Sequence, residues 1–86
     1  MSNGLNHDFC DKFRSEIKNH GLVTVVSELI ASNSDKVELK KRYIARECRK
    51  SAFAGKFKEA CDTVAARDGR AKASVFMLKQ EIGLIR

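Results

Sequence analysis

Arginine and lysine side chains gather in one short part of the chain, where their types and spacing could support the binding of phosphate or carboxylate groups. Residues 36–58 hold nine basic side chains and only two acidic ones, Glu38 and Glu47. This segment carries a formal charge of +7, whereas residues 1–35 carry −2 and residues 59–86 carry +1. Because nearly all of the net charge of +6 arises there, the sequence predicts an anionic partner for this segment.

Three arginines in this segment have the spacing of one helical face. Arg42, Arg46 and Arg49 follow the i, i+4, i+7 pattern, so a helix would align them along one exposed side. The planar guanidinium donates two parallel hydrogen bonds, which suits phosphate and carboxylate oxygens. We therefore predict a binding ridge, with Tyr43 at its edge, where its ring could stack on a base. The basic residues predicted to extend this contact are Lys50 beside the ridge and Lys40, Lys41, Lys56 and Lys58 around it.

Nucleic acid, or a nucleoprotein assembly, is the partner that the sequence favours for a regulatory module of this kind. Neutralising phosphates releases counterions, so such binding would weaken steeply with salt. The alternative is a small protein inhibitor or adaptor whose basic face docks on an acidic groove of a larger nucleic-acid-handling machine. A third interpretation is a solvated helix face without a partner. Exposed Phe or Met beside the arginines would favour a protein partner, and purely polar neighbours would favour nucleic acid.

A helix-turn-helix motif is only weakly indicated. The segment from Leu29 to Tyr43 places a turn between two predicted helices, with the basic helix second. The turn lacks the usual glycine, and phosphate contacts alone carry no sequence information. We therefore do not predict base-specific recognition.

The residue types needed for catalysis or metal binding form no recognisable site. Cys10, Cys48 and Cys61 contain no CxxC pair, and with His7 and His20 they make no zinc-binding pattern. His7 and Cys10 could neighbour each other on a helix, but a third, orienting group is missing. The phosphate-loop pattern GxxxxGK[ST] is absent, and the carboxylates are scattered. The sequence therefore predicts no enzyme, no cofactor and no metal, and it predicts buried cysteines.

The elements that carry these residues are predicted to be helices of one domain spanning residues 1–86, with a mobile start at residues 1–5. Apolar residues recur at intervals of three and four along the chain, and there is no proline to interrupt helices. The predicted helices cover residues 8–20, 22–31, 36–50, 51–68 and 71–83. Gly21 is predicted to close the first in a left-handed conformation, and Ser34 or Asp35 to cap the third. The fold class is all-α, a compact bundle of four to five short helices.

The last predicted helix is apolar around more of its circumference than one buried face requires. Phe76, Met77 and Leu84 lie off its main apolar stripe. Either this helix runs through the centre of the core, or it forms a contact with a homodimer mate or another partner. No apolar stretch approaches the roughly 20 residues that span a bilayer, and no secretory leader is evident. We therefore predict a cytoplasmic protein without a membrane partner.

Overall fold

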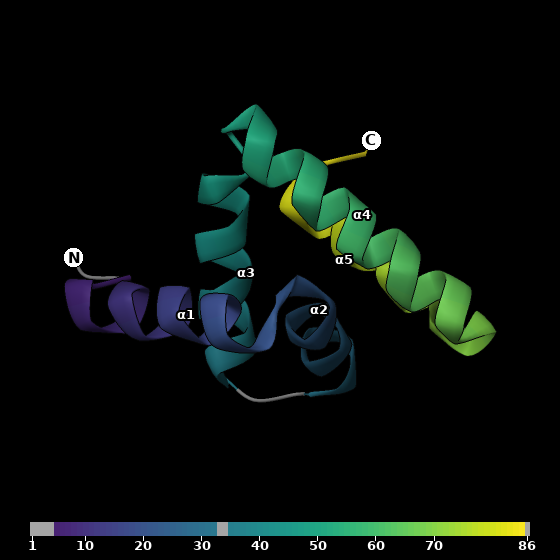
Figure 1. Cartoon of the computed structure of the whole chain (residues 1–86), viewed down its shortest axis with the longest axis horizontal. Helices are drawn as coiled ribbons and strands as arrows, with labels where there is room; N and C mark the ends of the chain where they lie inside the picture. The colour runs from purple at the N-terminus through teal and green to yellow at the C-terminus, as the bar shows by residue number, and fades with distance from the viewer. Residues whose placement is uncertain (1–4, 33–34, 86) are drawn as a thin grey trace.

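Helices account for all the regular structure of the described part of the chain. The structure, a computed structural model, describes residues 5–32 and 35–85 (Figure 1). Its elements are α1 (His7–His20), α2 (Leu22–Ala31), α3 (Asp35–Glu47), α4 (Ser51–Arg67), the 3-10 helix η1 (Gly69–Ala71) and α5 (Lys72–Ile82). The Cα radius of gyration is 12.3 Å, against about 12 Å expected for a compact chain of this length. The predicted compact all-α bundle is therefore confirmed.

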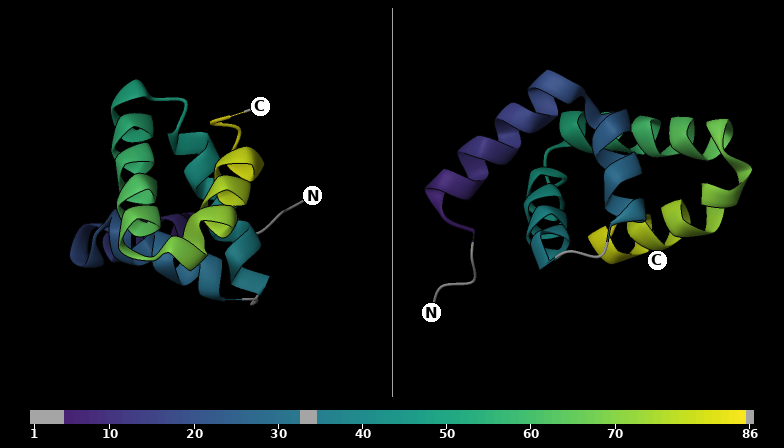
Figure 2. Two further views of the ribbon diagram at one scale, coloured as in Figure 1. Left: turned by 90° about the vertical axis from the view of Figure 1, so that its right-hand side faces the viewer. Right: turned by 90° about the horizontal axis from the view of Figure 1, so that it is seen from below.

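Two packing units meet at α3. Helices α4 and α5 form an antiparallel pair joined through η1, and α2 packs against α4 (Figures 1 and 2). Helix α1 packs against α2 and extends away from the α4–α5 pair (Figure 1). Helix α3 stands between α1 and that pair, and in the right-hand view of Figure 2 the start of α1 and the end of α5 flank it. This position decides which sides of α3 are covered.

The core is built from apolar side chains of all five α-helices. The largest fully buried side chains are Phe13, Val25, Val26, Tyr43, Ile44, Phe57 and Cys61. Helix α5 contributes Val75, Leu78 and Ile82 from one side only. Phe76 and Met77 point outward, with 52% and 57% of their surface exposed. The interpretation that α5 runs through the centre of the core is therefore wrong, because only one of its faces meets other helices.

The junction between α1 and α2 depends on Gly21. Its backbone has φ 86° and ψ 156°, so the positive φ is as predicted, but the conformation is extended rather than left-handed helical. Gly21 N–H donates to the carbonyl of Ile17 at 2.8 Å, which closes α1 without an intervening loop. At the next junction Asp35 is already the first residue of α3, and the alternative cap Ser34 lies outside the described residues.

Replacement of Gly21 by alanine should destabilise the protein, and replacement of Gly55 should stabilise it. No atom lies within 4 Å of a Cβ built at either site, so the two differ in backbone conformation rather than in space. The conformation at Gly21 is one that only glycine adopts readily, so Gly21→Ala should lower the free energy of unfolding by roughly 1–3 kcal/mol. Gly55 is inside α4, where alanine should add up to about 1 kcal/mol. Urea denaturation followed by circular dichroism measures both, and equal shifts of one sign would contradict this account.

Candidate functional site

Tyr43 sets the rotation of α3, which places the arginines. The ring packs edge-on against Phe13 of α1, with centroids 5.2 Å apart and an interplanar angle of 76°. Only 2% of the residue is exposed, and its hydroxyl accepts a hydrogen bond from Arg14 Nε at 3.2 Å. The prediction that Tyr43 lies at the edge of an exposed ridge is therefore wrong, and its ring has no free face for a base. The physical reason is that α1 covers this side of α3.

The three predicted arginines are exposed and line one groove. Arg42 and Arg46 lie on α3, but this helix ends at Glu47 rather than at the predicted residue 50, so Arg49 projects from the turn that follows it. The groove has a volume of about 640 Å³. Its remaining lining residues are Leu5, Ala45, Cys48, Ile82, Gly83 and Leu84. We call this surface the arginine groove; its lining residues come from α3 and the turn after it, from the residue Leu5 before α1, and from the end of α5.

Arg46 is held in place by two neighbours. Its Cζ lies 5.7 Å from the centroid of the Tyr43 ring, and its Nη2 donates to Cys10 Sγ at 3.5 Å. A cation over an aromatic face is attracted by the ring quadrupole. Because these contacts restrict the arginine before any ligand arrives, less conformational entropy is lost on binding.

The floor of the arginine groove is apolar and comes from three separate segments. Ala45 lies on α3 and Cys48 directly follows it, Leu84 follows α5, and Leu5 precedes α1. All four are half-buried and pack against the core. The sequence indicated this surface only indirectly, through Leu84, which lies off the main stripe of its helix. Leu84 therefore belongs to the arginine groove, and not to the stripe of α5 that exposes Phe76 and Met77.

Lys40 and Lys41 brace α3 against its neighbours and do not line the groove. Lys40 Nζ lies 3.2 Å from Glu16 of α1 and 5.3 Å from the Phe13 ring centroid. Lys41 Nζ lies 2.8 Å from Glu81 of α5 and 3.7 Å from Glu38. The two side chains are only 22% and 20% exposed. Their charge is thus largely compensated by carboxylates on either side of α3.

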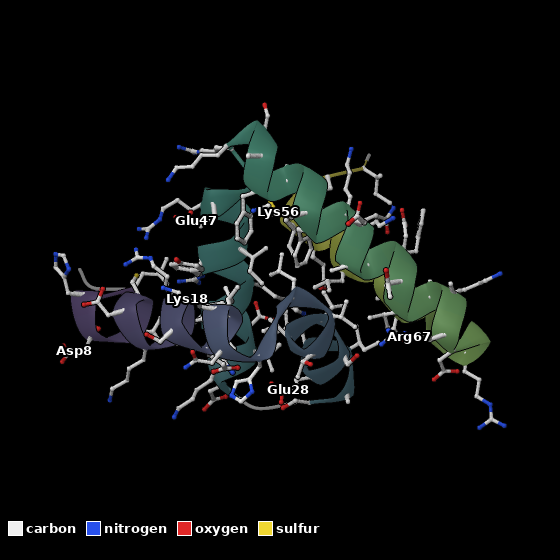
Figure 3. All side chains as sticks on the ribbon, in the orientation of Figure 1. Asp8, Lys18, Glu28, Glu47, Lys56 and Arg67 are labelled. Atoms are coloured by element: carbon white, nitrogen blue, oxygen red, sulfur yellow. The ribbon has the colours of Figure 1, made fainter. Side chains whose placement is uncertain are left out.

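The remaining predicted lysines surround the groove loosely. Lys50 is exposed and pairs with Glu47 at 3.7 Å. Lys56 and Lys58 are exposed on α4. Because they are two positions apart on the helix, their side chains point about 200° away from each other. Figure 3 shows Lys56 near the beginning of α4 and Arg67 at its other end. The lysines of α4 therefore do not continue the line of the three arginines.

The cysteines have the properties of packed apolar side chains. Cys10 and Cys61 are buried, Cys48 is half-buried, and all three are free thiols. Burial raises the pKa of Cys61 to about 11, and burial together with the nearby Glu47 raises the pKa of Cys48. Raised thiol pKa values oppose formation of the nucleophilic thiolate at neutral pH. Within residues 5–32 and 35–85 no group of His, Cys, Asp and Glu has an arrangement that could hold a metal ion.

Comparison of the chain with protein-family models, with curated proteins and with solved structures gives no match. The site is therefore argued from its own geometry. None of the helices described is both long enough and apolar enough to cross a membrane.

The raised pKa of Cys61 predicts a loss of stability in alkaline solution. The pKa of Cys61 is about 11 in the folded protein, whereas the ordinary pKa of a cysteine thiol is 9.0. The folded state therefore binds this proton more tightly than the unfolded state. The contribution of Cys61 to the free energy of unfolding is therefore fully present below pH 9 and is lost as the pH rises toward 11. Urea denaturation at steps from pH 8 to pH 11 should show a steeper decline for the wild type than for Cys61→Ala. Identical slopes would contradict the prediction, whatever the absolute stability of the variant.

Proposed function

We propose that this protein is a non-enzymatic, regulatory binding module that docks on an anionic macromolecule through the arginine groove. The observation that carries the proposal is the convergence of three exposed arginines on one groove, with Arg46 already held by Tyr43 and Cys10. Arginine is suited to this task because it stays charged and presents a fork of donors to phosphate or carboxylate. The raised pKa values of Cys48 and Cys61 further support binding rather than nucleophilic catalysis.

Two classes of partner meet this description. A nucleic acid or nucleoprotein assembly is supported by the three arginines and by the net charge of +6. A protein partner, for which this chain would act as an inhibitor or adaptor, is supported by the apolar floor beneath the arginines. Both classes require the same arginines, so the proposal can be tested before the classes are separated.

Neutralising the three arginines should abolish binding to polyanions. Fluorescence anisotropy with labelled single-stranded and duplex DNA and RNA measures the affinity of the wild type and of an Arg42→Gln/Arg46→Gln/Arg49→Gln variant. For duplex DNA, three phosphate contacts predict a slope of log K against log salt of about −2.7, equivalent to a loss of roughly 40-fold between 50 and 200 mM salt. The triple variant should show neither the binding nor this slope.

The control variant removes the same charge elsewhere. Arg67, Arg70 and Lys72 are exposed at the turn between α4 and α5, remote from the arginine groove. An Arg67→Gln/Arg70→Gln/Lys72→Gln variant has the same net charge as the first and should keep most of the affinity. Equal losses in both variants would show that total charge, rather than the arginine groove, governs binding.

The outer face of α5 supports a homodimer as a further proposed contact. Phe76 and Met77 are the large hydrophobic side chains exposed within the described residues, and such side chains commonly mark interfaces. If they pair two copies, light scattering should give a mass that rises with protein concentration, and Phe76→Ser/Met77→Gln should give the monomer mass. A concentration-independent monomer mass for the wild type would remove the proposal. Since neither side chain is in the core, the variant should keep the helical circular dichroism spectrum of the wild type.

A further inference from the structure

Three features of the arginine groove indicate one class of occupant. They are its apolar floor, the restriction of exposed positive charge to a short surface, and the spacing of its arginines. We infer that it binds an acidic amphipathic segment of a partner protein, whose carboxylates pair with the arginines and whose apolar side chains cover the floor. This inference rests on the proposed function and specifies its partner.

The apolar floor is the first reason. Leu5, Ala45, Cys48 and Leu84 are half-buried, so each still exposes apolar surface inside the arginine groove. A phosphate backbone offers no apolar group to cover that surface, whereas a protein segment does. Covering it removes apolar area from water, which is the main favourable term in protein association.

The confinement of the charge is the second reason. A nucleic-acid strand is held by a groove of positive charge that follows its backbone, combined with aromatic side chains on which bases stack. Here Lys40 and Lys41 are paired with carboxylates, and Lys56 and Lys58 point away from each other on α4. Tyr43 is buried. The site is therefore a short basic surface without a continuing track or a stacking platform.

The spacing of the arginines is the third reason. Arg42 and Arg46 are four residues apart on α3, which corresponds to about 6 Å along the helix, and Arg49 lines the same groove from the turn that follows Glu47. A partner helix with carboxylates at positions i and i+4 has the spacing of Arg42 and Arg46, and a third carboxylate at i+7 extends toward Arg49. The adjoining positions of that helix can carry apolar side chains. An amphipathic helix laid into a groove is a recurrent mode of peptide recognition. The match between carboxylates and arginines would raise the association rate and fix the register of the partner helix.

A pair of synthetic peptides tests the inference. The first is a labelled 16-residue helical peptide, blocked at both ends, with three Glu at i, i+4 and i+7 and Leu at the adjoining positions. The second has the same charge but Gln in place of each Leu. Anisotropy should show that the wild type binds the first peptide at least tenfold more tightly than the second. The Arg42→Gln/Arg46→Gln/Arg49→Gln variant should bind neither.

Two further measurements locate the binding on the floor. Leu84→Gln should weaken binding of the Leu peptide roughly tenfold and should weaken binding of the Gln peptide much less. Cys48 is the half-buried thiol in the floor, so bound Leu peptide should slow its alkylation by iodoacetamide, as read by mass spectrometry. This second readout needs no variant and is independent of how Leu84→Gln folds.

The outcomes separate the inference from the proposed function. If oligonucleotides bind the wild type and not the arginine variant, while the Leu peptide binds no better than the Gln peptide, the inference is overturned and the proposed function stands. If the Leu peptide binds without protecting Cys48, the inference is also overturned. If neither peptide nor oligonucleotide binds at low salt, the proposed function itself fails. Preferential binding of the Leu peptide with protection of Cys48 supports both.

Discussion

The burial of Tyr43 against α1 is the constraint on which the site depends. Its ring meets Phe13 edge-on, and its hydroxyl accepts from Arg14, so both the apolar and the polar part of the side chain are satisfied on the α1 side of α3. Once one side chain of a helix is fixed toward a neighbour, the directions in which its other side chains point are fixed as well. With Tyr43 facing α1 and Lys41 facing α5, Arg42 and Arg46 line the groove between these neighbours, and Arg49 lines it from the turn after Glu47.

The charges of α3 serve two different purposes. Lys40 and Lys41 meet carboxylates on α1 and α5 across short distances and are mostly covered by protein. Pairs at a surface of this kind typically contribute no more than about 1 kcal/mol each, so their main effect here is to orient α3. Arg46 instead contacts an aromatic ring and a sulfur atom, neither of which neutralises its charge. The basic residues of segment 36–58 thus divide into lysines that pair with neighbouring helices and arginines whose charge is exposed in the groove.

The apolar floor beneath the exposed arginines restricts which chemical groups fit the arginine groove. Charge alone would accept any polyanion, and its attraction would be screened by salt. The half-buried Leu5 and Leu84 add surface that only an apolar group covers favourably. They reach the site from the two ends of the described chain, and α3 supplies the arginines between them. The proposed partner chemistry therefore follows from the assembly of three segments.

The sequence by itself determined the helices, most of their boundaries and the placing of Arg42 and Arg46 one turn apart, because these depend on local periodicity and on residue type. It extended α3 too far, since the helix ends at Glu47 and Arg49 lies in the turn beyond it. The outward positions of Phe76 and Met77 could not be read from it, since an apolar side chain fits a core or a contact equally well. Tyr43 was misplaced for a related reason. A helical projection gives the angle between side chains on one helix but not which neighbouring helices cover which angles. Only the tertiary structure decided that α1 covers Tyr43, that α3 is held by Lys40 and Lys41, and that Leu5 and Leu84 form a floor. Those contacts join segments far apart in the chain, and their geometry depends on how whole helices pack.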